Sequence, residues 1–112
     1  MTRTTSFKRG ELALVRFVFA DESGAKRRPV LVLSSDHTRD DLVVVAVTSN
    51  LSRKQPGEHV VQDWEEAGLP KPSLVTSIFR TIKRSMIDNA LGRLSAADML
   101  AVEQRLRDVL GL

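Results

Sequence analysis

The sequence predicts a mainly β fold in which about five short strands form a small antiparallel barrel or strongly bent sheet, followed by one C-terminal helix. Two observations carry this prediction. Short apolar runs rich in Val, Leu and Phe alternate with polar loops through most of the chain, without a helical segment between successive strands. Only after Leu94 does the spacing of apolar residues change to three and four.

The first three strands are predicted from composition. Leu12 to Phe19 is rich in β-branched and aromatic residues, and Leu42 to Thr48 is apolar on both faces, which is typical of a central strand. Pro29 cannot donate to a ladder, so we expect it at the start of a strand over Val30 to Ser34. The segment from Ala20 to Arg28 contains Asp, Ser and Gly, and is therefore expected to be a loop.

Two more strands are predicted in the second half. Glu58 to Gln62 alternates between polar and apolar residues, and Ser73 to Lys83 is long enough to bend. Between them, the segment DWEEAG predicts one helical turn that is capped by Asp63 and ended by Gly68.

The C-terminal helix is predicted from its cap and its apolar stripe. Ser95 and Asp98 have the spacing of a capping box, and Leu94 precedes them as a hydrophobic staple. Apolar residues then recur at helical spacing, at Met99, Val102, Leu106, Val109 and Leu110. We expect this stripe to pack on the barrel, and the alternative is a surface that binds a partner.

Length and composition indicate one domain and exclude several kinds of site. The 112 residues suit a single core, which we expect over residues 10–112 after a loose polar tail at 1–9. The absence of cysteine excludes a disulfide scaffold, an iron–sulfur cluster and a thiol nucleophile. With only two histidines, we expect no metal centre and no cofactor.

The location of the protein is predicted from its hydropathy. The longest aliphatic run, Leu42 to Val47, is far shorter than the roughly 20 residues of a membrane span. The N-terminus has no apolar segment typical of a secretory signal, so we expect a cytoplasmic protein.

The charge distribution suggests a polyanionic partner. Lys and Arg number 17 against 14 Asp and Glu, which gives a net charge of +3, and the basic residues cluster at Lys8-Arg9, at 26–28 and at Arg53-Lys54. Such clusters fit nucleic acid, because neutralised phosphates release counterions. On charge alone, however, the solvated faces of strands and turns are the better interpretation of these clusters.

Several motifs, in this order, resemble the MazF/PemK/Kid toxins: GELALVRF, KRRPVLVLSSD, VVVAVTSN, DWEEAGLPKPS, RTI and LGRLS before the helix. The resemblance covers the chain from about Gly10 onwards. It implies an SH3-like, CcdB/MazF-type barrel that acts as a homodimer, and the toxin of a type II toxin–antitoxin system. Its implied activity is that of an mRNA interferase, a metal-independent and sequence-selective endoribonuclease that cleaves single-stranded RNA through 2′-OH attack. The implied protein partner is an antitoxin whose disordered C-terminal tail blocks the RNA groove.

The resemblance places two catalytic residues. Arg28 matches the catalytic arginine, whose planar charged fork suits the extra negative charge at phosphorus. Thr48, at a strand end, matches a residue whose hydroxyl donates to a phosphate oxygen. Without the family pattern, a surface arginine and a packed strand-end threonine would be the simpler interpretations. We expect further RNA contacts from Lys26, Arg27, Ser49, Asn50, Arg53 and Lys54.

The general base is left open by the sequence. One branch of the family uses an Arg-x-Asp pair on the strand after the Pro-Ser dipeptide, where this chain has Thr76 and Ile78. His37 and His59 are the only side chains whose ordinary pKa lies near neutrality, and a solvated surface histidine is the simpler interpretation of each.

Two other functions compete with RNA cleavage. A catalytically degenerate family member would bind RNA or antitoxin and act in transcriptional autoregulation, and the substitutions at Thr76 and Ile78 keep this alternative open. A CcdB-like gyrase poison is the other alternative, although it would leave Arg28 and Thr48 without a role.

Overall fold

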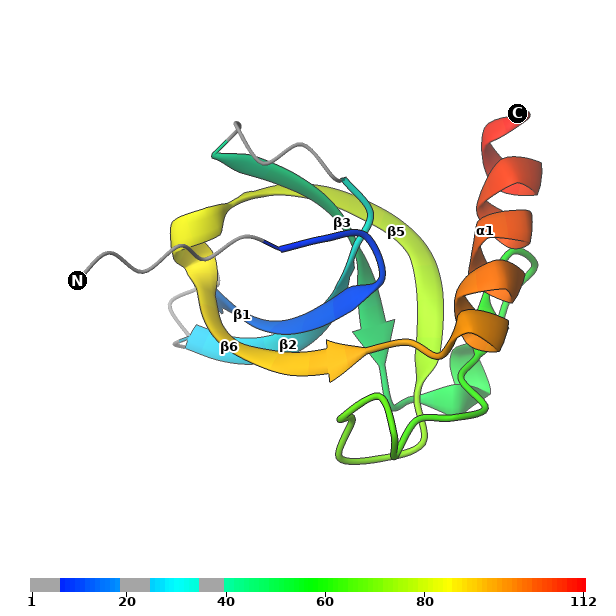
Figure 1. Ribbon diagram of the computed structural model, residues 1–112, viewed down its shortest axis with the longest axis horizontal. Coiled ribbons are helices and arrows are strands. Elements are labelled where there is room, and N and C mark those ends of the chain that lie inside the picture. The colour runs from blue at the N-terminus through cyan, green and yellow to red at the C-terminus, as the bar shows by residue number, and fades with distance from the viewer. Residues whose placement is uncertain (1–6, 19–24, 35–39) are drawn as a thin grey trace.

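The computed structural model describes residues 7–18, 25–34 and 40–112. One antiparallel sheet curves into a barrel-like layer, and a helix packs beside it (Figure 1). The strand order is β4-β5-β3-β2-β1-β6, which confirms the predicted mainly β fold with a C-terminal helix. In chain order, the elements are β1 (Glu11–Val18), β2 (Ala25–Val32), β3 (Asp41–Thr48), η1 (Leu51–Arg53), β4 (His59–Val60), β5 (Leu74–Lys83), η2 (Arg84–Met86), β6 (Ile87–Arg93) and α1 (Ala96–Leu110).

Strand β6 is missing from the sequence-based prediction. Its residues, IDNALGR, include Asp, Asn, Ala and Gly, which are depleted in strands. The strand forms because β1 supplies a partner over Glu11 to Val15, with two register shifts along the way. Tertiary pairing therefore overrides the weak local preference of this edge segment.

Strand β2 begins earlier than predicted, so Lys26, Arg27 and Arg28 lie in a strand and not in a loop. Pro29 stands inside this strand, opposite Leu14 of β1. It is tolerated there because β2 is paired on one side only at that point: its pairing with β3 runs from Val30 to Val32.

The core has two clusters, one on each face of the curved sheet, because successive side chains of a strand alternate. On the face towards α1, the buried residues are Leu12, Leu31, Val45, Val47, Val61, Ala67, Leu69, Val75, Leu94 and Val102. On the other face they are Phe7, Ala13, Val15, Val30, Val32, Leu42, Val44 and Ile82. Phe7 is buried although it belongs to the stretch 1–9 that the sequence predicts to be a loose tail. Residues 1–6 of that stretch lie outside the described part of the chain.

The two edge regions of the sheet meet through two glycines. A Cβ at Gly68, in the turn after β4, would lie 2.2 Å from the carbonyl oxygen of Leu91 in β6. A Cβ at Gly92 would likewise lie 2.2 Å from the carbonyl oxygen of Ala67. Only glycine permits this backbone contact, which brings the turn against the end of β6 and makes the open sheet barrel-like.

Helix α1 is capped as predicted. The Ser95 hydroxyl accepts from Asp98 N at 3.1 Å, and Gly111 ends the helix with a φ of 74°. Val102 is buried on the sheet, whereas Leu110 is 53% exposed, so the apolar stripe packs at its N-terminal end and emerges at its C-terminal end. In the described part of the chain, no helix has the length and apolar character needed to cross a membrane.

Candidate functional site

Arg28 and Thr48 are brought to one face of the sheet by strand register. The last pair of the β2–β3 ladder towards this end is Val30 with Ala46. Side chains two residues apart in a strand point to the same face, so Arg28 and Thr48 both lie on the face of this pair. Arg28 is exposed and Thr48 is half-buried on that face.

The three neighbouring cations of β2 divide between the two faces. Lys26 shares the face of Arg28, whereas Arg27 points to the opposite face, where its Nε donates to Asp88 Oδ2. Arg27, Asp88, Asn89 and Leu14 line a shallow polar depression of about 340 Å³. Among the described residues, no acidic side chain forms an ion pair with Arg28. Its guanidinium is thus available for a ligand, while that of Arg27 is partly neutralised.

The segment after β3 forms a compact polar turn. Thr48 Oγ1 accepts from Asn50 N at 3.1 Å, and Asn50 Oδ1 accepts from Ser52 Oγ at 2.6 Å. Ser49 and Lys54 are exposed beside it. The predicted RNA-binding residue Arg53 lies in η1, and its side chain is outside what the structure describes.

Thr76, which occupies the position of a possible catalytic arginine, has a structural role. Between the pairs Val45–Phe79 and Val47–Val75, strand β5 has three residues opposite the single residue Ala46, so it bulges. The buried Thr76 hydroxyl donates to Ala46 O at 2.8 Å and accepts from Ile78 N at 3.1 Å. It therefore replaces ladder hydrogen bonds that the bulge interrupts.

His59 is not the solvated histidine that the sequence suggested. It is 8% exposed, and its Nε2 lies 2.8 Å from Oδ1 of the buried Asp98. The same carboxylate accepts from Gln62 N and Asp63 N, each at 2.9 Å. Burial opposes ionisation of Asp98, but these hydrogen bonds outweigh it and hold its pKa below the ordinary range. The other histidine, His37, lies outside the described residues.

Asp98 has a role beyond the predicted cap, in which its backbone N–H donates to Ser95 Oγ. Its carboxylate attaches α1 to the segment that follows β4, because it accepts a hydrogen bond from Asp63 N. The predicted helical turn is present as hydrogen bonds from Ala67 N to Asp63 O and from Gly68 N to Glu65 O. No sequence pattern marks this contact, because β4 and α1 are more than 30 residues apart.

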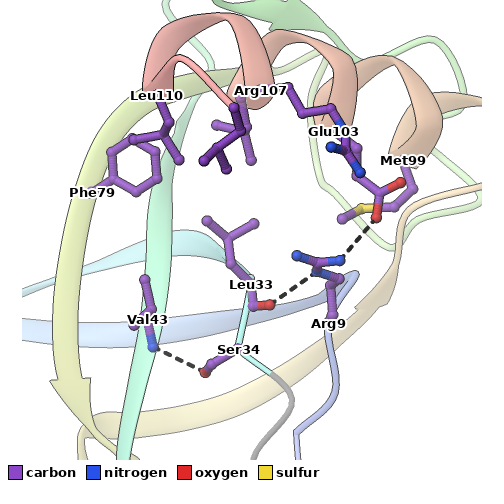
Figure 2. A pocket seen from close by; sticks show the side chains of 11 residues that line it. Arg9, Leu33, Ser34, Val43, Phe79, Met99, Glu103, Arg107 and Leu110 are labelled. Carbon is purple, nitrogen blue, oxygen red and sulfur yellow. Dashed lines mark hydrogen bonds and ion pairs between the residues drawn. The ribbon is translucent and has the colours of Figure 1, made fainter.

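A separate apolar cleft of about 330 Å³ lies between α1 and the strands β3 and β5 (Figure 2). Phe79 and Leu110 form one side, Val43 and Leu33 the floor, and Arg9 donates to Leu33 O at 3.1 Å and pairs with Glu103 at the rim. Across the described ranges, His, Asp and Glu side chains form no group of three or more that could hold a metal ion.

A family model described as "PemK-like, MazF-like toxin of type II toxin-antitoxin system" matches residues 8–110. No curated protein matches at the significance level applied.

Several solved structures share the fold. The MazE–MazF complex of Deinococcus radiodurans (Form-II) is 23% identical, with a TM-score of 0.80, over 96% of this chain and 98% of that chain. MazF alone from the same organism (Form-I) is 25% identical, with a TM-score of 0.75, over 96% and 99%. A mycobacterial endoribonuclease in complex with its cognate antitoxin is 20% identical, with a TM-score of 0.78, over 96% and 97%.

Proposed function

Because the chain belongs to the PemK-like, MazF-like family of type II toxin–antitoxin toxins, we propose that it is an endoribonuclease that cleaves single-stranded RNA without a metal ion. The observation that supports the proposal is that the exposed, cationic Arg28 and the hydroxyl of Thr48 lie on the same face of the sheet, since each lies two residues from the Val30–Ala46 pair along its strand. Structural neighbours described as endoribonucleases support it.

The chemistry proposed for this pair uses the RNA's own nucleophile. The 2′-hydroxyl gives its proton to solvent water, and its oxygen forms a bond to the adjacent phosphorus. The bond to the 5′-oxygen breaks and this oxygen takes a proton from water, which yields a 2′,3′-cyclic phosphate and a 5′-hydroxyl. The protein has to stabilise the negative charge that grows on the non-bridging oxygens. The Arg28 guanidinium can contact two of these oxygens, and the Thr48 hydroxyl can donate to one.

The general base, which the sequence leaves open, is not assigned in this proposal. Of the two histidines, His59 is held by Asp98 on the side of α1, and His37 lies outside the described residues. The hydroxyl of Thr76, which stands where one branch of the family has an arginine, donates to a backbone carbonyl. Catalysis by positioning and charge stabilisation alone is expected to account for much of the rate.

The decisive experiment is cleavage of a long single-stranded RNA in EDTA with mapping of both ends. We expect cuts at a short motif, with a cyclic phosphate on one fragment and a 5′-hydroxyl on the other. RNA binding without cleavage would instead favour a degenerate, regulatory family member. Inhibition of gyrase by a protein that neither binds nor cuts RNA would favour the CcdB-like alternative.

We propose an antitoxin as the protein partner, since solved neighbours include complexes with a cognate antitoxin. An acidic, disordered tail would compete with RNA for the accessible cations Lys26 and Arg28. The addition of such a peptide should therefore inhibit cleavage, and this inhibition should weaken as salt concentration rises.

We also propose that the protein is a homodimer, with apolar surface around the α1 cleft buried between the two copies. Leu110 and Val43, which line the cleft, are 53% and 40% exposed, and Leu112 is 81% exposed. Such adjoining apolar residues are typical of an interface. Leu110→Glu should shift sedimentation towards the monomer, whereas Leu100→Glu, on the same helix but outside the cleft, should not. A wild-type monomer at micromolar concentration would contradict the proposal.

A further inference from the structure

Two separate hydrogen bonds orient side chains in the turn after β3. Ser52 Oγ donates to Asn50 Oδ1 at 2.6 Å, and the backbone N–H of Asn50 donates to Thr48 Oγ1 at 3.1 Å. Each bond occupies an acceptor of the side chain that it reaches. They leave two donors directed outwards, which are the Asn50 amide NH2 and the Thr48 hydroxyl proton.

The side chain of Asn50 is held in an unusual way for its position. It is the N-cap of η1, where an asparagine oxygen ordinarily accepts from a backbone N–H of the helix. In this structure, the N-cap makes no side-chain bond to the backbone of η1, and the Ser52 hydroxyl occupies its oxygen instead. Because the amide oxygen and nitrogen lie on opposite sides of the group, this bond fixes the direction of the NH2.

The Thr48 hydroxyl is oriented by a similar argument. Its oxygen already accepts the Asn50 N–H, so its own proton must point away from that bond. Within the described ranges, no protein acceptor for this proton is found. Because the Thr48 oxygen accepts one hydrogen bond, its own O–H is polarised and becomes a stronger donor.

The ligand that suits these donors is an anion rich in acceptors. Asn50 and Ser52 are exposed, Thr48 faces the side of the sheet that carries Arg28, and the cationic Lys54 follows η1. A phosphodiester offers two non-bridging oxygens, both acceptors. Building on the proposed function, in which the Thr48 hydroxyl donates to the phosphate, we propose that the Asn50 amide binds the same RNA phosphate and that Ser52 is the positioning residue that fixes this amide for it.

This proposal predicts a specific pattern of coupling. Ser52→Ala frees the Asn50 amide to rotate, which should lower kcat/KM about fivefold, the equivalent of one neutral hydrogen bond. Ser52→Thr retains the hydroxyl and should recover most of the loss. In an Asn50→Ala background, Ser52→Ala should have no further effect, because Ser52 acts only through Asn50. Ser85→Ala, which changes an exposed serine of η2, is the matched control and should be neutral.

The experiment measures two quantities on each variant: cleavage of RNA in EDTA with mapping of the cut sites, and binding of a 2′-O-methyl RNA that cannot be cut. Circular dichroism checks folding. Equal cleavage and binding by wild type and Ser52→Ala would overturn the proposal, as would additive losses in the double variant. A changed cut motif in Ser52→Ala would also overturn it, because the amide would then contact a base.

The binding measurement separates this proposal from the proposed function. If the wild type binds the 2′-O-methyl RNA without cutting RNA, and Ser52→Ala weakens that binding, the phosphate site stands and the catalytic function falls. If the wild type cuts RNA and the Ser52 variants behave as the wild type, the reverse holds. If the wild type neither binds nor cuts, both fall.

Discussion

Two polar networks of the molecule differ in what their hydrogen bonds leave free. Where β4 meets α1, the carboxylate of Asp98 is 1% exposed and receives His59, Gln62 N and Asp63 N. Around Thr48, the hydrogen bonds join exposed groups and leave donors pointing outwards. The first network has the features of a structural joint, and the second those of a binding surface.

The difference is one of desolvation. A buried charge is costly unless it is fully hydrogen-bonded, which explains why Asp98 has three partners from a distant segment. An exposed donor has water as a partner, so it can exchange that water for a ligand oxygen at little cost. Substitutions in the two networks should therefore separate stability from activity.

The largest expected effect is on activity, at Arg28. Arg28→Ala should lower the rate of RNA cleavage about 10²–10³-fold while the protein stays folded, because its charge is needed only as the phosphate reacts. Arg28→Lys should recover little, since a point charge cannot make a two-pronged contact. Cleavage at saturating RNA, with circular dichroism for the fold, measures both.

Arg27→Ala is the control for this prediction. Its side chain lies on the other face and is bound to Asp88, so it should weaken RNA binding only modestly. If Arg27→Ala is inactive and Arg28→Ala is fully active, the catalytic arginine is Arg27 and our assignment of Arg28 is wrong.

The next effect is on stability, at Asp98. Asp98→Ala leaves the buried His59 and two partly buried N–H groups without their acceptor and should lower the free energy of unfolding by about 3 kcal/mol. The fraction that remains folded should cleave RNA at the wild-type rate. Urea unfolding measures the first quantity, and an activity loss larger than the unfolded fraction would connect this network to the site.

The same residue predicts a dependence on pH. Because folding lowers the pKa of Asp98, the stabilisation that it gives is present above its ordinary value of 3.8 and is lost as pH falls through the folded value. The wild type should therefore lose stability as pH drops below about 4. In Asp98→Asn, the free energy of unfolding should fall less steeply over that pH range. If its dependence on pH is the same as in the wild type, Asp98 is not the cause of the loss.

A smaller stability effect is expected at the β5 bulge. Thr76→Val keeps the shape of the side chain but removes the hydroxyl that bonds Ala46 O and Ile78 N, which should cost about 1–3 kcal/mol. Thr76→Ser keeps the hydroxyl and should cost less. Thermal unfolding of the pair measures the difference, and equal melting temperatures would show that the hydroxyl contributes nothing.

The sequence predicted what local patterns encode. The apolar runs of β1 and β3, the long β5 and the Ser95 cap of α1 are all present, since each depends on residues close in the chain. The positions that it missed depend on distant partners. Strand β6 requires pairing with β1, and the burial of His59 requires Asp98, which is 39 residues away.

The candidate site shows the same division. The family resemblance selected Arg28 and Thr48, but their common face follows from the β2–β3 register, which the sequence alone did not provide. The position of Ser52 could not be predicted either. A serine two residues after an asparagine is common in turns, and only the 2.6 Å contact indicates its role.

The smallest expected effect is that of Thr48→Ser, which separates the role of the Thr48 hydroxyl from that of its methyl group. Thr48→Ser keeps the acceptor for Asn50 N and the outward proton, and it loses only the packing of one methyl group. The rate of cleavage should therefore remain within about threefold of the wild-type rate. Thr48→Val keeps the β-branched shape and removes both hydrogen-bonding capacities, so its loss should be about 100-fold. Rates at saturating RNA for the two variants measure the ratio. Because valine suits a strand end as well as threonine does, a folded but inactive Thr48→Val assigns the loss to the hydroxyl. Equal activity of the two variants would instead return Thr48 to a packing role and leave Arg28 as the residue that carries the site.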